Sequence, residues 1–203
     1  CLAGMNPRYV LKRELLVDPC LDIVGHRLPN HFLDRQARDS TPELAALASL
    51  VSDMSDDSVG IIFPEGTRAN PVKRTKALDK IAASDPERGR RLAGMRHLLP
   101  PRPSGAAAMA GGQTRADIVL AWHTGFEGLD TFSGIYGAIA RGVPPVHFVF
   151  QRHARSSVPA VGEHSNGDFT RWLDEQWMAI DEMIDHVLTT RAEQGSEKGR
   201  GNV

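Results

Sequence analysis

Apolar positions along the chain form short uninterrupted runs separated by longer segments of mixed polarity. Strand-length apolar runs occur at 59–63, 118–122 and 146–150. Residues 9–11 are also β-prone, and segment 28–33 ends in a possible short strand around Phe32. Runs without polar alternation are typical of parallel strands that are buried on both faces. The pattern therefore predicts an α/β fold with a mixed, mostly parallel sheet and helices on both of its faces.

Helical spacing is clearest in two segments. Thr41 and Pro42 suit the start of a helix, and apolar residues then recur to Val51. A long amphipathic helix is predicted from the spacing of Phe169, Trp172, Leu173, Trp177, Ile180, Ile184 and Val187. Segment 69–102 is polar and irregular, with a helical stretch expected around 80–95. The Gly- and Ala-rich stretch 105–115 receives no assignment.

Length and composition describe an ordinary globular domain. The 203 residues are 41% hydrophobic and 24% charged, with a net charge of −1, which excludes wholesale disorder and a general attraction to nucleic acid. We expect a single domain over 1–188 and a flexible polar tail over 189–203. No apolar run reaches the roughly 18–20 residues that a membrane-spanning helix needs. Two cysteines, Cys1 and Cys20, provide neither a disulfide framework nor a C-x-x-C zinc motif.

The most informative segment is Ile61–Arg68, with the sequence I-I-F-P-E-G-T-R. A buried strand leads into a turn that begins at Pro64, and Gly66 permits tight backbone geometry there. Glu65 and Arg68 follow at the strand end, which is where open α/β sheets bind ligands. A guanidinium suits phosphate because it donates two parallel, charge-assisted hydrogen bonds. An arbitrary E-G-T-R tetrapeptide is more often simply a turn after a strand with a surface Glu–Arg pair.

The octapeptide resembles the third motif of the phospholipid and glycerol acyltransferase family, a strand ending in F-P-E-G-T-R. Upstream, Lys12–Leu15 is similar to the family's K-x-E-L segment. Gly25 followed by Phe32–Arg35 resembles its second motif, which ends in an arginine. Downstream, 97–105 is similar to the L-x-P-R-x-x-G run of lysophosphatidic acid and lysocardiolipin acyltransferases. The resemblance covers about residues 8–122, and the motifs occur in the family's order.

This resemblance implies a glycerol-phosphate acyltransferase-like core and an O-acyltransferase activity in phospholipid synthesis or remodelling. A fatty acyl group would move from a thioester of coenzyme A or acyl carrier protein to the hydroxyl of a glycerol-phosphate or lysophospholipid acceptor. The family requires no metal or cofactor and works at the cytoplasmic face of a membrane, so peripheral membrane contact is expected. The residues expected to bind the acceptor phosphate are Lys12, Arg35 and Arg68. The residues expected to support catalysis, partly through backbone N–H groups that stabilise an oxyanion, are Glu65, Gly66 and Thr67.

The family's catalytic pair, H-x-x-x-x-D, is missing from these 203 residues, because none of the eight histidines is followed by Asp five residues later. That histidine would take the proton of the attacking hydroxyl. Two interpretations stay open. The pair belongs to chain preceding Cys1, or the protein is a catalytically inactive, acyltransferase-like domain that binds lipid or a partner. His123, between a buried strand and Gly125, is the histidine to test as a substitute base.

Charge is distributed unevenly. Segment 68–102 has ten Lys and Arg against three acidic residues, a balance of +7. This segment either attracts an anionic leaflet or the phosphates of coenzyme A, or is an ordinary solvated surface. Nucleic-acid binding is not expected, because no aromatic residue is interleaved there. The predicted helix over 168–188 is acidic, which favours packing on the sheet over membrane contact. The scattered histidines lack metal-ligand spacing, and no G-x-S-x-G elbow is present.

Overall fold

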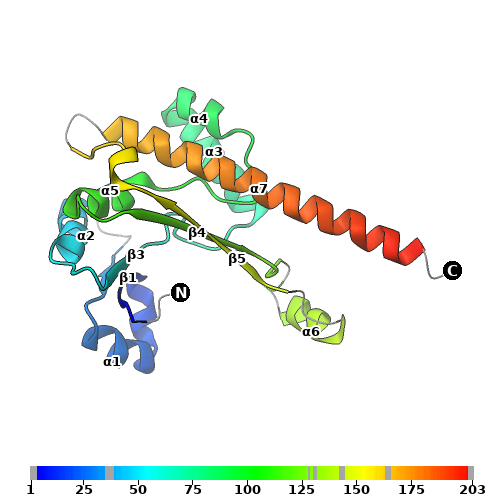
Figure 1. Cartoon of the computed structure of the whole chain (residues 1–203), viewed down its shortest axis with the longest axis horizontal. Helices are drawn as coiled ribbons and strands as arrows, with labels where there is room; N and C mark the ends of the chain where they lie inside the picture. The colour runs from blue at the N-terminus through cyan, green and yellow to red at the C-terminus, as the bar shows by residue number, and fades with distance from the viewer. Residues whose placement is uncertain are drawn as a thin grey trace.

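The computed structural model describes residues 4–34, 39–127, 129, 132–141, 145–162 and 166–200 (Figure 1). The chain is a mixed α/β protein, as the sequence predicts. Its elements are β1 (Asn6–Lys12), η1 (Arg13–Val17), α1 (Pro19–Arg27), β2 (His31–Leu33), α2 (Thr41–Ser52), β3 (Ser58–Ile61), α3 (Pro71–Ser84), α4 (Pro86–Leu92), α5 (Pro103–Gly112), β4 (Ile118–Thr124), α6 (Phe132–Arg141), β5 (His147–His153), η2 (Arg155–Ser157) and α7 (Asn166–Arg200).

The first three strands form a small parallel sheet in the order β2-β1-β3. Lys12 at the end of β1 lies opposite Leu33 at the end of β2, and Tyr9 lies opposite Ile61 at the end of β3. The predicted parallel pairing is therefore confirmed for these strands. Because all three run in one direction, their carboxyl ends meet at a single edge of the sheet.

Helices cover both faces of this parallel sheet. Val10 of β1 packs with Leu47 and Val51 of α2 and with Met109 of α5. On the opposite face, Gly25 of α1 lies directly against the Phe32 ring, where a Cβ atom would come within 2.3 Å of the ring. Successive side chains of a strand point to opposite faces, so alternation along β1 and β2 separates the two helical layers.

The remaining two strands differ from the expected single sheet. β4 and β5 pair antiparallel, with Ile118 opposite His153 and Thr124 opposite His147, and form a second, separate ladder. The prediction of mostly parallel pairing is wrong for these two strands. Their apolar runs resemble those of parallel strands because residues on both faces are apolar, although only one face of β4 is buried and β5 is exposed over nearly its whole length.

α7 lies across the covered face of the β4–β5 ladder (Figure 1). Its buried side chains form the larger core together with residues of α4, α5 and β4, which confirms that this helix packs on the sheet. The core residues from α7 are Phe169, Leu173, Trp177, Ile180 and Ile184. The expected polar tail from residue 189 continues, up to Arg200, as the last turns of α7.

Helix α5 connects the two halves of the molecule. Ala107 and Ala110 belong to the core around α7, whereas Met109 belongs to the core on the parallel sheet. The small residues of the unassigned stretch 105–115 allow this close approach. At Gly112, an added Cβ would lie only 2.3 Å from the backbone oxygen of Ala48 in α2.

Segment 69–102 contains more helix than its polarity predicts. The expected helical stretch around 80–95 is two helices, α3 and α4, and α3 begins at Pro71, well before the expected start. Asn70 caps α3 by accepting a hydrogen bond from the N–H of Lys73 at 2.8 Å, and Asp85 caps α4 in the same way from Arg88 at 2.9 Å. Capping and proline at the first turn therefore override a weak apolar pattern.

Substitution of Gly112 tests the contact between α2 and α5. We expect Gly112→Ala to lower the free energy of unfolding by about 2–3 kcal/mol, because the new methyl group collides with backbone that cannot move away cheaply. Gly111→Ala is the matched control, because its Cβ would meet Val161 at an ordinary 3.5 Å. It should gain roughly 0.5–1 kcal/mol through helix propensity. Urea unfolding of both variants measures the difference, and equal stabilities would contradict the packing described.

Candidate functional site

The carboxyl edge of the parallel sheet collects the residues that the sequence singles out. Lys12 ends β1, Asp34 follows β2, and the motif turn 63–68 follows β3. An ion pair of 2.8 Å between Arg13 and Asp34 joins the ends of β1 and β2. Ligand sites of parallel α/β sheets lie at this edge. The topology thus brings the start of the K-x-E-L-like segment, Lys12, and the F-P-E-G-T-R turn to the same edge of the sheet. Arg35 lies outside the described residues.

The backbone of the motif turn is tightly fixed. The N–H of Gly66 donates to the carbonyl of Phe63 at 3.0 Å, and Gly66 is buried with a φ of +73°. An L side chain rarely adopts that conformation, so the predicted role of this glycine in the turn is confirmed. The N–H of Arg102 donates to the carbonyl of Pro64 at 3.0 Å. This N–H of Gly66 is committed to the turn, so it does not serve as an oxyanion donor in this conformation.

Glu65 faces the protein interior rather than a substrate. Its carboxylate accepts a hydrogen bond from the N–H of Leu99 at 3.3 Å. Burial raises the pKa of the Glu65 carboxyl group above its ordinary value; the Leu99 N–H, the nearby Trp177 and Arg74 oppose part of that rise. Glu65 therefore anchors the turn to segment 96–102.

That segment is held in turn by a buried carboxylate of α7. Asp181 is 2% exposed and accepts hydrogen bonds from three consecutive backbone N–H groups, those of Arg96, His97 and Leu98, at 2.7, 2.8 and 2.7 Å. Arg74 of α3 binds the same segment from the other side through the carbonyls of His97 and Leu98, at 3.0 Å each. The motif turn thus rests on a loop that two charged side chains fix.

A second buried carboxylate of α7 fixes α4. Asp174 is 1% exposed and receives two hydrogen bonds of 2.8 Å from the guanidinium of Arg88, with Arg91 at 3.6 Å. Arg88 also donates to the carbonyl of Pro101 at 2.8 Å. Three of the ten basic residues of 68–102, Arg88, Arg91 and Arg96, thus form ion pairs with the acidic helix α7. For the other basic residues, attraction to an anionic leaflet or to phosphates stays a prediction.

Two of the exposed cations of this segment, Arg68 and Lys73, lie at the motif turn. Lys73, in the first turn of α3, places its Nζ 3.2 Å from Oγ1 of Thr67 and 3.4 Å from the carbonyl of Arg68. The Arg68 side chain is exposed, and no ion pair occupies its guanidinium among the residues described. The N-terminus of α3 adds a partial positive charge at the same place. Thr67, Arg68 and Lys73, which we call the cation turn, form an electropositive corner suited to phosphate.

Lys73 is a residue that the motif does not identify. The Asn70-Pro71 pair in the sequence could have identified it, because this pair marks a helix start. Lys73 then falls in the first turn of the helix, next to the motif turn that precedes it. Lys12 is half-buried at the end of β1 on the same sheet edge, and its ammonium group makes no hydrogen bond or ion pair with the described residues.

None of the described histidines forms a general base at the cation turn. His97 binds Asp185 at 2.9 Å, and His31 binds Glu43 at 2.8 Å, so each joins two elements. His123 is exposed on β4, with its ring 4.9 Å from that of Phe126 and 5.6 Å from that of Phe148. It does not line the depression beside η2 or the one between α4 and α7, and its role as a substitute base stays a prediction.

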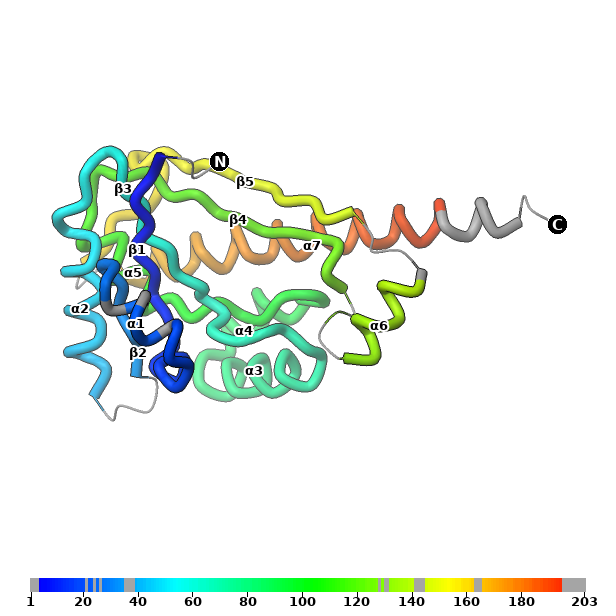
Figure 2. Tube along the Cα trace, turned by 90° about the horizontal axis from the view of Figure 1, so that it is seen from below, coloured from blue at the N-terminus to red at the C-terminus, as the bar shows by residue number. Residues whose placement is uncertain are grey.

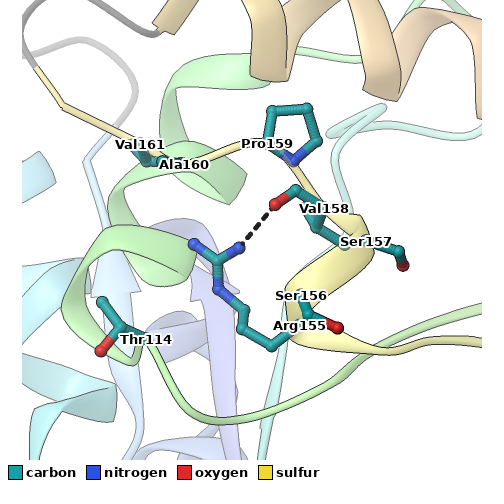
Figure 3. A pocket seen from close by; sticks show the side chains of 8 residues that line it. All are labelled: Thr114, Arg155, Ser156, Ser157, Val158, Pro159, Ala160 and Val161. Carbon is teal, nitrogen blue, oxygen red and sulfur yellow. Dashed lines mark hydrogen bonds between the residues drawn. The ribbon is translucent and has the colours of Figure 1, made fainter.

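Other features of the described residues offer no second site. No group of three or more His, Cys, Asp or Glu among them could hold a metal ion. A shallow depression beside η2 contains the Arg155 guanidinium, which donates to the Val158 carbonyl at 3.0 Å (Figure 3). The Ser156 and Ser157 hydroxyls point away from it. Within the described ranges, no helix has both the length and the apolar character to cross a membrane.

No protein-family model matches the chain, and no solved structure matches it.

Replacement of Asp181 tests the support beneath the motif turn. We expect Asp181→Ala to reduce the free energy of unfolding by about 3 kcal/mol or more, because three buried N–H groups lose a charged acceptor. The neighbouring Glu182 is exposed, so Glu182→Ala should change stability by less than about 0.5 kcal/mol. Chemical denaturation followed by circular dichroism measures both. Similar losses in the two variants would show that Asp181 is not the anchor.

The raised pKa of Glu65 predicts a pH-dependent stability difference. In the folded state this carboxyl group holds its proton more tightly than in the unfolded chain, where its pKa is near 4.5. As pH rises from about 4.5 through the raised pKa, the folded wild type therefore loses stability relative to Glu65→Gln. The advantage of the Gln variant should grow across that window and then level off. Urea unfolding at a series of pH values measures it, and a constant difference would refute the interpretation.

Proposed function

We propose that the chain is an acyltransferase-like protein whose cation turn binds the phosphate of a glycerol-phosphate or lysophospholipid acceptor. The observation that carries the proposal is the arrangement of Thr67, Arg68 and Lys73 at the N-terminus of α3, on the carboxyl edge of the parallel sheet. A guanidinium, an ammonium and a helix N-terminus are the groups that proteins use for phosphate. The F-P-E-G-T-R resemblance supplies the chemical class of the acceptor.

In this proposal the motif residues have separate tasks. Arg68 and Lys73 hold the phosphate, and Lys12 adds positive charge from the end of β1. Glu65 keeps the turn in place through Leu99, and Gly66 provides the backbone conformation. The acceptor hydroxyl would then attack the carbonyl carbon of an acyl thioester carried by coenzyme A or acyl carrier protein. A carbon–oxygen bond forms, the carbon–sulfur bond breaks, and the thiolate takes up the proton that a base removes from the hydroxyl.

A second candidate function is binding without transfer. It is favoured by one specific observation, because no His of the 203 residues is followed by Asp at the spacing of the family's catalytic pair. His31 and His97 also lie in structural pairs, and His123 lies on an exposed face. The cation turn would then recognise a phosphate-bearing lipid as a ligand.

Acceptor binding tests the role of the cation turn. We expect Arg68→Ala and Lys73→Ala each to weaken binding of a short-chain 1-acyl-glycerol-3-phosphate at least tenfold, because a charged hydrogen bond contributes about 1.5–3 kcal/mol. Arg90→Ala removes the same charge from an exposed position of α4 and should bind within twofold of wild type. Isothermal titration calorimetry below the micellar concentration measures the three affinities.

Two results would count against the assignment. Equal losses in Arg68→Ala and Arg90→Ala would mean that only overall charge matters, and no binding by the wild type would remove the site. Transfer is followed separately, through release of free thiol from acyl-coenzyme A or acyl carrier protein. Wild-type protein that binds the acceptor and releases no thiol has the second function.

A further inference from the structure

Strand β5 forms an open edge of the β4–β5 ladder. All seven of its residues pair with β4 on one side, and among the described residues no further strand pairs with it on the other. Within the described ranges, no backbone hydrogen bond outside the ladder involves residues 147–153. Figure 2 shows β5 at the outer margin of the ladder. The N–H and C=O groups on its outer side therefore have no backbone partner in the described part of the chain.

This edge lacks the features by which proteins usually prevent strand pairing. Edge strands are commonly short, interrupted by a bulge, or protected by lysine or proline. β5 runs in continuous register with β4 from His147 to His153, and its sequence H-F-V-F-Q-R-H contains neither lysine nor proline. Six of its seven residues are exposed. The backbone of β5 is therefore accessible to another strand along its whole length.

The sequence of β5 is complementary to itself. Two copies of one strand pair antiparallel about a two-fold axis, and the register that pairs all seven residues is centred on Phe150. Phe150 then lies opposite Phe150 of the second copy, and Phe148 lies opposite Arg152. Aromatic pairs, and an arginine beside an aromatic ring, are favourable neighbours across strands. The other pairs in this register are Val149 with Gln151 and His147 with His153.

The charges of the strand also fit a second copy. Arg152 is the one Lys, Arg, Asp or Glu of β5, and its Nε donates to the carboxylate of Asp117 at 2.6 Å. In the centred register each Arg152 lies beside Phe148 of the other copy, so the two arginines do not face one another. Pairing therefore brings no like charges together, which favours a second copy of the chain over an unrelated strand.

We propose that the chain forms a two-fold dimer in which the β5 strands of two copies pair antiparallel about Phe150 and join the two ladders into one continuous sheet. Because each copy contributes the same edge, association stops at the dimer. The backbone hydrogen bonds provide affinity, and the side-chain pairs set the register. An interface of one strand from each copy is small, so we expect a dimer that dissociates at micromolar concentration. The inference goes beyond the proposed function and does not rest on it.

Sedimentation equilibrium tests this pairing. Phe150→Glu places two carboxylates opposite each other at the two-fold axis and should weaken the wild-type dimer at least tenfold. Val119→Glu is the matched control, because Val119 is also exposed but lies on β4, opposite Arg152 of its own ladder. It should leave the dissociation constant within twofold of the wild-type value. Circular dichroism confirms folding of each variant.

A mixing experiment tests the register. Phe150→Lys should dissociate the dimer as Phe150→Glu does. An equimolar mixture of the two variants should associate again, because opposite charges then face each other at the centre of the pair. Recovery in the mixture is specific to a register that brings residue 150 of one copy opposite residue 150 of the other.

Three results would overturn the proposal. The first is a wild type that stays monomeric at millimolar concentration, and the second is a mixture that does not associate. The third is an equal loss in Phe150→Glu and Val119→Glu, which would place the contact on the face of the ladder and not on its edge. Arg68→Ala should dimerise like the wild type, so failure of the cation turn to bind an acceptor leaves this result unchanged.

Discussion

Two buried carboxylates on α7 determine where the motif turn sits. Asp181 fixes three backbone N–H groups of segment 96–98, and Asp174 fixes Arg88 of α4. A buried charge is tolerated only when its hydrogen bonds are satisfied, so these contacts leave little freedom to the segment between α4 and α5. Leu99 of that segment in turn binds Glu65. The long C-terminal helix, which carries none of the motif residues, therefore controls the geometry of the motif.

The contact between Leu99 and Glu65 explains why residues of F-P-E-G-T-R have different roles. Glu65 and Gly66 face inward and set the backbone, whereas Thr67 and Arg68 face outward beside Lys73. Burial of the Glu65 side chain in this first task raises the pKa of its carboxyl group, and the N–H of Leu99 opposes part of that rise. A residue placed in that way is better suited to hold a loop than to exchange protons with a substrate.

The sequence predicts local features better than pairings. Strands β1, β3, β4 and β5 are found because each is a compact apolar run, and α2 because Thr41 and Pro42 mark its start. The antiparallel pairing of β4 with β5 is missed, because the sequence does not distinguish apolar residues on an exposed face from apolar residues on a buried face. The buried charges Asp174 and Asp181 are missed as well. Their seven-residue spacing along the apolar side of α7 was the available signal, but acidic residues on a helix are normally solvated.

Exposed aromatic rings on the β4–β5 ladder and buried carboxylates on α7 are two departures from the usual distribution of side chains. The buried charges are tolerated because Arg88 of α4 pairs with Asp174 and three backbone N–H groups bind Asp181. Phe148 and Phe150, in contrast, stay 58% and 63% exposed in the described part of the chain. Apolar area left in water forgoes about 25 cal/mol for each square ångström that burial would have gained. The stability of this half of the protein therefore comes from the core that α7 forms with α4, α5 and β4.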